Sequence, residues 1–261
     1  MNIKNYIVTD RSFYKSLLIM ALPLAAQNIV SMGVNLVDNI MLGALGETAL
    51  SASSLANHYI SLFQYGMMGI SMGSSVLTAR FWGASDQHSL KRTVTIALRI
   101  AILLAILLSV VTALFPEQIM GLYTHETAVV QGGKEYLLWS IPTFLLSAFS
   151  MVCTNILRSI GLGKVPLKAS LVAFFVNIGA NYVLIFGKLG LPAMGIAGAA
   201  LGTVIARVLE FGVICGYFFV ADTKIGYRIH DIISPCRDLL REYLRISVPV
   251  FIQRYAAGCG R

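Results

Sequence analysis

Charged residues are scarce in this 261-residue chain, at 12% of the sequence, whereas hydrophobic residues make up 57%. Soluble domains carry roughly 25% charged residues. Together with a mean hydropathy of +0.75, this scarcity excludes an ordinary soluble protein and predicts an integral membrane protein. The net charge of +8 comes from scattered basic residues. Because they form no basic motif with interleaved aromatic residues, we expect no nucleic acid partner.

Sequence signals for metal binding, catalysis and secretion are also lacking. The four cysteines form no C-x-x-C pair, so we expect neither a disulfide nor a metal centre from them. No H-E-x-x-H motif and no paired aspartates within an apolar run occur, and we therefore expect a protein that is not an enzyme and needs no cofactor. Residues 1–16 lack an apolar segment ending in a cleavage site, so the first span is expected to stay as an uncleaved anchor.

Six apolar runs are long enough to cross a membrane, which takes about 20 residues of helix. They are residues 16–42, 51–78, 94–115, 136–157, 167–186 and 196–220. The connectors between them are short, as in one compact bundle. The sequence therefore predicts a cytoplasmic segment at 1–15, a six-helix lobe at 16–220, a cytoplasmic loop at 221–245 and the start of a second lobe at 246–261.

Basic residues are distributed unevenly between the connectors. Fourteen Lys and Arg residues lie in alternate connectors, while the connectors between them hold only Lys134 and Lys188. Cytoplasmic loops carry the excess of positive charge. The pattern predicts a multi-pass protein of the cytoplasmic (inner) membrane whose N-terminus is cytoplasmic.

The first apolar run carries a polar stripe that contains an aspartate. Gln27, Ser31, Asn35 and Asp38 recur at steps of four, four and three residues, which places them on one helix face. A carboxylate within a membrane costs roughly 2.5–3.5 kcal/mol and faces a protein interior or a cavity. We expect the stripe, together with His58 of the second run, to line a cavity. Hydrogen bonding between helices is the alternative for its amides and hydroxyl, and a satisfied buried imidazole is the alternative for His58.

A short internal repeat indicates a second lobe. The sequence LPLAAQ at residues 22–27 is echoed by VPVFIQ at residues 248–253. Six intervening spans give both copies the same orientation, as in parallel repeats about an axis along the membrane normal. The chain ends soon after the echo, so we expect a truncated or frame-shifted gene product rather than a complete protein.

Several stretches resemble the multidrug and toxic compound extrusion (MATE) transporters. They are LPLAAQNIVSMGVNLVDNIMLGALGETALSASSLA, TARFWGASDQHSLKR, LRSIGLGKVPLKAS, NIGANYVLIFGKLGLPAMGIAGAALGT and SVPVFIQ. A complete member of that family has twelve helices in two six-helix lobes that face a central cavity. The resemblance implies an all-α membrane protein, here the six-transmembrane-helix lobe of such a transporter, truncated at the start of helix seven.

The resemblance also implies site residues. Asp38 matches the first-helix aspartate of cation coupling, and Asn177 and Asn181 match two polar positions of the fifth helix. Thr203 and the backbone carbonyl of Ala199 match positions of the sixth helix. Some relatives carry aspartate where this chain has Asn181, so the coupling ion stays open between proton and sodium. A sodium ion would lie at Asp38, Asn177, Asn181 and Thr203, whose oxygens suit a hard cation.

The function implied by the resemblance is a cation-coupled antiporter that exports cationic, amphipathic drugs or toxic compounds. Gln27, Ser31, Asn35 and His58 would line its substrate cavity. The alternatives are a lipid-linked precursor flippase of the same superfamily and a non-functional half-transporter fragment. Either the missing second lobe or a homodimer partner would be needed. Arg207 and Glu210, three residues apart in the last span, are expected to form an ion pair.

Overall fold

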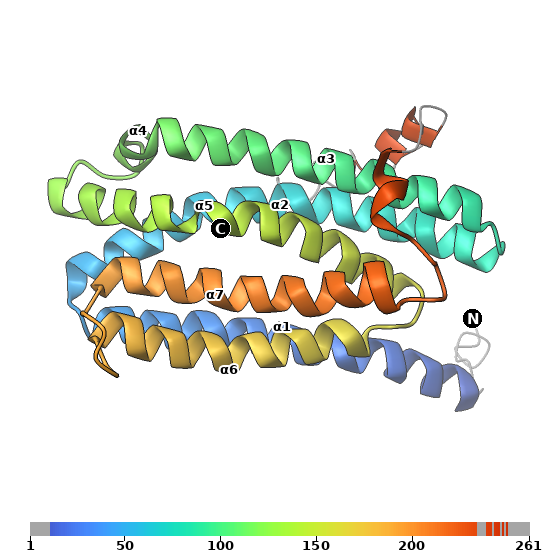
Figure 1. Cartoon of the computed structure of the whole chain (residues 1–261), viewed down its shortest axis with the longest axis horizontal. Helices are drawn as coiled ribbons and strands as arrows, with labels where there is room; N and C mark the ends of the chain where they lie inside the picture. Colours follow the sequence, from blue (N-terminus) through green and yellow to red (C-terminus); the bar gives the residue numbers. More distant parts are fainter. Residues whose placement is uncertain (1–10, 234–238, 242, 246, 248, 250–261) are drawn as a thin grey trace, which may run out of the picture.

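The computed structural model describes residues 11–233, 239–241, 243–245, 247 and 249, and within these residues it contains helices and no strand (Figure 1). The long helices are α1 (Arg11–Gly43), α2 (Glu47–Gly83), α3 (Gln87–Leu114), α5 (Thr127–Ser159), α6 (Lys164–Phe186) and α7 (Gly195–Gly216). Three short elements, α4 (Pro116–Gly121), η2 (Tyr217–Ala221) and η3 (Ile229–Ile233), complete the set. Each predicted span thus forms one long helix.

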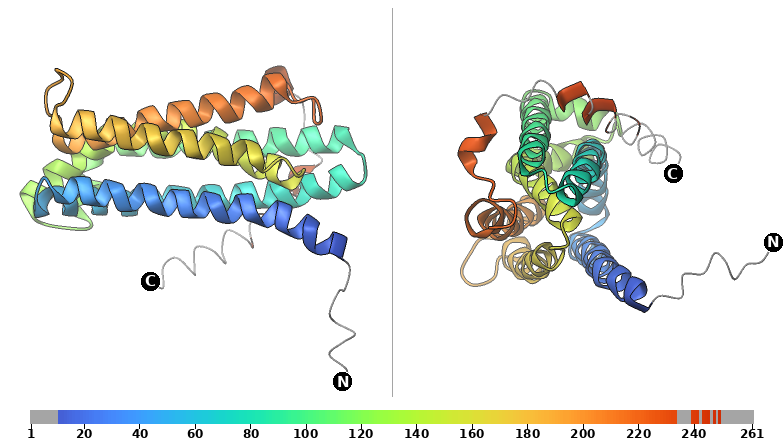
Figure 2. Two further views of the ribbon diagram at one scale, coloured as in Figure 1. Left: turned by 90° about the horizontal axis from the view of Figure 1, so that it is seen from below. Right: turned by 90° about the vertical axis from the view of Figure 1, so that its right-hand side faces the viewer.

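The six long helices lie side by side as one bundle (Figure 1). Helix α5 packs against α2, α3 and α7, while α6 packs against α7 and α1. Contacts between α1 and α2 are few, and the end-on view in Figure 2 places the first part of α1 at the margin of the bundle. The loose junction of α1 and α2 leaves room for a cavity between them.

Several helices begin before the apolar runs that predicted them. Helix α3 begins at Gln87 because Asp86 caps it: the Asp86 Oδ1 atom accepts a hydrogen bond from the Ser89 backbone N–H at 3.0 Å. An N-cap of this kind satisfies one of the free N–H groups at a helix start. Helix α4 was not predicted. It has six residues and opens on Pro116 at its first position, too short a segment to show hydrophobic periodicity.

The core between α2, α3 and α5 combines aromatic and small residues. The rings of Phe63 and Phe144 meet edge to face with centroids 5.0 Å apart, a favoured aromatic geometry. Ala97, Ala101 and Ala105 of α3 are fully buried, and such small side chains let membrane helices approach closely. This packing therefore holds α2 and α5 in place, and these two helices form one side of the cavity.

Helices α6 and α7 approach each other closely at two glycines. A Cβ atom added at Gly198 would lie 2.7 Å from the Leu184 carbonyl oxygen, and one added at Gly202 would lie 1.9 Å from Asn181 Oδ1. Only glycine fits at such distances. The two glycines therefore let α6 and α7 pack close together, and Gly202 leaves room for the Asn181 side chain.

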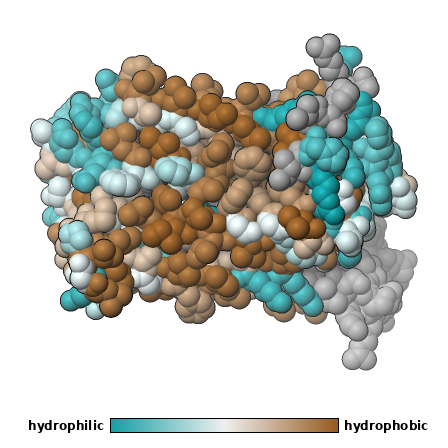
Figure 3. Space-filling model, viewed as in Figure 1, coloured by the Kyte–Doolittle hydropathy of each residue, from teal (hydrophilic) through white to brown (hydrophobic). Residues whose placement is uncertain are grey.

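The surface fits a membrane environment. Within the described residues four helices are long and apolar enough to cross a membrane: α3, α5, α6 and the continuous segment Gly195–Ala221. Figure 3 shows a broad apolar region over the middle of the molecule with hydrophilic residues toward its two ends. Helices α1 and α2 run alongside these four (Figure 1) and contribute many of the residues that line the cavity.

The loop that follows η2 is folded onto α3. Arg99 donates from Nε and Nη2 to the Ile232 carbonyl oxygen at 2.8 and 2.6 Å, and the Thr95 and Tyr227 hydroxyls lie 2.9 Å apart. The predicted cytoplasmic loop 221–245 is thus ordered over its first part. The predicted start of a second lobe, residues 246–261, lies outside the described residues except for Ser247 and Pro249.

Candidate functional site

The aspartate of the α1 stripe meets two asparagines of α6. Asn181 Nδ2 donates to Asp38 Oδ1 at 2.6 Å, and the same nitrogen lies 3.4 Å from Asn177 Oδ1. Both asparagines are buried, whereas Asp38 is partly exposed. The structure therefore brings together three of the predicted site residues from helices that are 143 residues apart in the sequence.

The amide oxygen of Asn181 is left without a partner. Asn181 Oδ1 is buried and accepts no hydrogen bond from any described residue. A buried acceptor without a donor costs about 1–3 kcal/mol. Asp38, Asn177 and Asn181 thus present carboxylate and amide oxygens to one small region. Such oxygens suit sodium, and the carboxylate could instead take a proton.

Thr203 and Ala199 lie one turn apart on α7, as predicted. The Thr203 hydroxyl donates to the Ala199 carbonyl oxygen at 3.0 Å. The Thr203 hydroxyl oxygen keeps lone pairs that can accept a hydrogen bond or bind a cation. Thr203 lines the same cavity as Asp38, whereas Ala199 is buried at 2% exposure. The Ala199 carbonyl oxygen already accepts the Thr203 proton, and its contribution as a cation ligand stays a prediction.

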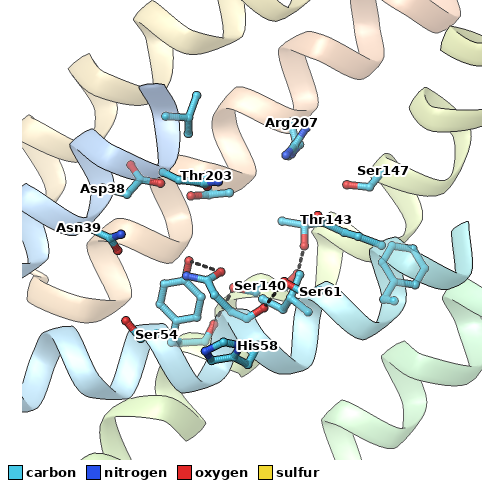
Figure 4. A pocket seen from close by; sticks show the side chains of 17 residues that line it. Asp38, Asn39, Ser54, His58, Ser61, Ser140, Thr143, Ser147, Thr203 and Arg207 are labelled. Carbon is cyan, nitrogen blue, oxygen red and sulfur yellow. Dashed lines mark hydrogen bonds between the residues drawn. The ribbon is translucent and has the colours of Figure 1, made fainter. Parts of the chain in front are cut away.

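A cavity of about 310 Å³ lies between α1, α2, α5 and α7. Figure 4 shows Asp38 and Thr203 on one side of it, with Ser54 and His58 of α2 on the other. A second cavity of about 160 Å³ adjoins α6, and Asn35, Thr203 and Arg207 line both. The walls are rich in hydroxyls and amides, so a ligand here would meet many neutral hydrogen-bonding groups.

The predicted lining residues divide into two groups. Asn35 and His58 line the larger cavity, and Ser31 lines the smaller one. Gln27 lines neither of these two cavities. It is buried, donates from Nε2 to Ser170 Oγ at 3.0 Å, and accepts two hydrogen bonds from Arg158 on Oε1. For Gln27 the alternative reading, hydrogen bonding between helices, describes its position.

Several residues that line the larger cavity were not among the predicted site residues. Tyr136 of α5 is buried, lines the larger cavity, and its hydroxyl lies 3.4 Å from Asn57 Oδ1. Ser140, Thr143 and Ser147 of the same helix also line it. Their spacing of three and four residues marks one helix face, a signal that was available in the sequence.

A chain of hydrogen bonds links the end of α5 to the cavities. Beyond Arg158 and Gln27, the Ser170 hydroxyl contacts Glu210 Oε1 at 3.1 Å. The other oxygen of Glu210, Oε2, lies 2.5 Å from Arg207 Nη1. The predicted ion pair of Arg207 and Glu210 is confirmed.

A short serine motif lies within helix α2. The sequence GISMG at residues 69–73 fits the G-x-S-x-G pattern of serine hydrolases, which requires a sharp strand-to-helix turn. Here Ser71 lies in the middle of α2, fully buried, and its hydroxyl donates to the Met67 carbonyl oxygen at 2.6 Å. The matching residues therefore form a packed segment of helix α2 and not a strand-to-helix turn.

Comparison with known proteins identifies the family of this helical lobe. The MatE family model matches residues 23–183, which include Asp38, Asn177 and Asn181. The chain belongs to the MatE family. The match also confirms the resemblance that the sequence motifs indicated.

Two relatives of the chain are named as probable multidrug resistance proteins. The chain is 26% identical over 260 residues to the probable multidrug resistance protein NorM of Thermotoga maritima, covering 98% of this chain and 55% of the relative. It is 29% identical over 249 residues to the probable multidrug resistance protein YoeA of Bacillus subtilis, covering 92% and 53%. The chain therefore spans about half the length of the curated relatives it matches.

Solved structures of MatE-type transporters share the fold. A MOP superfamily transporter from Pyrococcus furiosus matches with a TM-score of 0.83 at 23% identity, over 92% of this chain and 52% of that one. An inward-facing multidrug resistance MATE transporter matches with a TM-score of 0.79 at 22% identity, over 94% and 55%. The chain has the fold of the amino-terminal lobe of these transporters.

Proposed function

We propose that this lobe forms half of a cation-coupled antiporter that exports cationic, amphipathic drugs or toxic compounds. One observation carries the proposal: the partly exposed carboxylate of Asp38 sits between a buried asparagine pair and a polar cavity. Ionisable groups of this kind within membrane helices mark ion and substrate pathways. The multidrug resistance names of relatives support export of drugs as the task.

The coupling ion of the proposal is a proton or sodium. With asparagine at position 181, Asp38 is the single carboxylate of the Asp38, Asn177 and Asn181 cluster. A proton would neutralise it directly, whereas sodium would use the amide oxygens and the Thr203 hydroxyl as further ligands. No other cofactor enters the proposal.

The proposed mechanism is competition between cation and drug for two shapes of the lobe. Each ligand shifts the equilibrium only by its differential affinity for those shapes. An ionised Asp38 attracts a cationic drug and favours drug-bound states. Neutralisation of Asp38 by a proton or sodium removes that attraction and promotes release outside.

The proposed setting is the cytoplasmic membrane, with the N-terminus in the cytoplasm. Its support is the excess of basic residues in alternate connectors. The proposal includes a second lobe or a second copy of this chain, because a central cavity needs a wall opposite α1 and α2. The flippase alternative is less well supported, since Arg207 is the only lysine or arginine among the described residues that line the two cavities and it is already paired with Glu210.

The test compares Asp38→Asn with the unaltered chain in everted membrane vesicles, with a fluorescent cationic dye added to the medium and its uptake into the vesicles measured. We expect the substitution to abolish dye transport driven by a proton or sodium gradient while leaving the amount of protein in the membrane unchanged. Glu135→Gln, at an exposed position of α5, serves as the matched control. Normal transport by Asp38→Asn would refute the coupling role. Absence of transport by the unaltered chain would favour the non-functional fragment.

A further inference from the structure

The hydrogen-bond chain that starts at Arg158 has a fixed direction. A guanidinium only donates, so the Gln27 Oε1 atom that faces Arg158 must accept. Gln27 Nε2 is then the donor to Ser170 Oγ at 3.0 Å. The single proton of the Ser170 hydroxyl is left to point to Glu210 Oε1 at 3.1 Å.

Glu210 consequently receives donors on both oxygens. Ser170 donates to Oε1, and Arg207 Nη1 lies 2.5 Å from Oε2. A carboxylate that only accepts matches this arrangement. The Glu210 side chain is 12% exposed and that of Arg207 is 39% exposed. Glu210 is therefore the fixed partner of the pair, and Arg207 is the partner with free space around it.

That free space is the cavity that contains Asp38. Arg207 lies one helical turn after Thr203, and both residues line this cavity with Asp38 (Figure 4). Asp38 itself is hydrogen-bonded to the neutral amide of Asn181. Among the described residues that line the two cavities, Arg207 is the only lysine or arginine, so the guanidinium on the wall of the cavity that Asp38 also lines is the one paired with Glu210.

We propose that Arg207 is a tethered cation that competes with the coupling cation for Asp38, and that Glu210 is the carboxylate that holds Arg207 away. The proposal builds on the coupling role of Asp38 proposed above. When Arg207 is paired with Glu210, Asp38 is open to a proton or sodium. When Arg207 is paired with Asp38, the site is closed to both. The two pairings are alternative states whose populations the ligands bias.

The experiment measures the reaction of Asp38 with dicyclohexylcarbodiimide, an apolar reagent that attacks neutral carboxyl groups, in the purified chain in detergent. Peptide mass spectrometry counts the adduct at each position. In the unaltered chain we expect an adduct at Asp38 and protection of Glu210. In Glu210→Gln we expect the Asp38 adduct to fall roughly tenfold or more, because a nearby guanidinium keeps a carboxylate ionised.

The double variant Glu210→Gln with Arg207→Gln decides whether Arg207 causes the protection. We expect it to restore the Asp38 adduct, and Glu210→Asp, which keeps the carboxylate, to leave the adduct near its original level. Glu47→Gln, at an exposed position of α2, is the control for loss of a carboxylate elsewhere. Gel filtration and circular dichroism confirm that each variant is folded.

Three results would overturn the proposal: an unchanged Asp38 adduct in Glu210→Gln, a lost adduct that the double variant does not restore, or an Asp38 already protected in the unaltered chain. The readout involves no transport. A chain that fails to export dye can therefore still confirm the exchange of Arg207 between the two carboxylates, and a chain that exports dye can still refute it.

Discussion

Asn181 of α6 points its amide oxygen at Gly202 of α7, so closely that a Cβ atom at position 202 would lie 1.9 Å from Oδ1. The contact fixes the amide whose nitrogen holds Asp38 at 2.6 Å. The absence of a side chain on α7 is thus part of the site on α1. Small residues at helix interfaces have this general effect in membranes.

The first prediction concerns this contact. Gly202→Ala should displace Asn181 and destabilise the lobe by about 1–3 kcal/mol, the usual cost of overpacking. Gly212→Ala on the same helix has no atom within 4 Å of the added Cβ and should instead be neutral or stabilise by about 0.5–1 kcal/mol. Unfolding in detergent, followed by circular dichroism, measures both. Equal effects of the two substitutions would contradict the proposed contact.

A second prediction concerns the charge of the cluster. Asn181→Asp places a second carboxylate where the present nitrogen lies 2.6 Å from Asp38 Oδ1. An extra unit charge about 4 Å away is worth between about 1 and 4 kcal/mol, so sodium should bind at least about fivefold more tightly. The sodium dependence of the melting temperature measures this affinity.

Asn155→Asp is the control for the second prediction, because it adds the same charge at the far end of α5. Asn155 Nδ2 donates to the Met151 carbonyl oxygen at 2.9 Å, and the residue lines a different cavity. An equal gain in sodium stabilisation by both variants would show that the charge acts without regard to position.

A third prediction concerns the N-cap of α3, at a turn outside the membrane-spanning segments. Hydrogen bonds from Ser89 hold the pKa of Asp86 below its ordinary value of 3.8. A lowered pKa means that the ionised form stabilises the fold; this stabilisation is fully present above about pH 3.8 and is lost as the pH falls through the lowered pKa.

The measurement for the third prediction is the melting temperature of Asp86→Ala relative to the unaltered chain at pH 7 and at pH 3. The difference should shrink at the lower pH. Asp86→Ser retains a capping oxygen without the charge, so its difference should be smaller than that of Asp86→Ala at pH 7 and should shrink by the same amount at pH 3, because only Asp86 of the unaltered chain titrates. A difference for Asp86→Ala that is constant across this range would argue against the ionised cap.

A fourth prediction concerns the loop that lies on α3. Arg99 donates two hydrogen bonds to the Ile232 carbonyl oxygen, and bonds from a charged donor contribute about 1.5–3 kcal/mol. Arg99→Met should therefore let trypsin cut after Lys224 and Arg228 about tenfold faster. Lys188→Met, in the loop between α6 and α7, should leave the rate unchanged. If cleavage is as slow in Arg99→Met as in the unaltered chain, other contacts hold the loop.

The sequence was sufficient to predict the six long helices, though not the residue at which each begins, and to predict one polar face of α1. The six spans follow from the lengths of the apolar runs. Spacing within one helix predicts the stripe of Ser31, Asn35 and Asp38 and also the pairing of Arg207 with Glu210. The structure agrees because these relationships are local. The cation-coupling role of Asp38 and its neighbours stays a prediction that the variants above address.

Relationships between helices were beyond the sequence pattern. Gln27 shares the face of Asp38, yet it contacts Arg158 and Ser170 because α5 and α6 pass on either side of it. Tyr136 enters the cavity through the same packing. Helix starts at Gln87 and Thr127 were missed because the first turns of α3 and α5 contain polar residues and precede the apolar runs, and α4 was missed because it is only six residues long.

The hydrogen-bond chain from Arg158 to Arg207 has one further consequence. A proton wire needs every member to receive a proton on one side and release one on the other, but a guanidinium at each end only donates. The hydrogen bonds from Arg158 to Arg207 are continuous, but they cannot conduct a proton. A proton therefore does not reach the cavities along this chain, and we expect its path to Asp38 to run through the cavity itself, so that access to Asp38 depends on the side of the membrane to which the cavity opens.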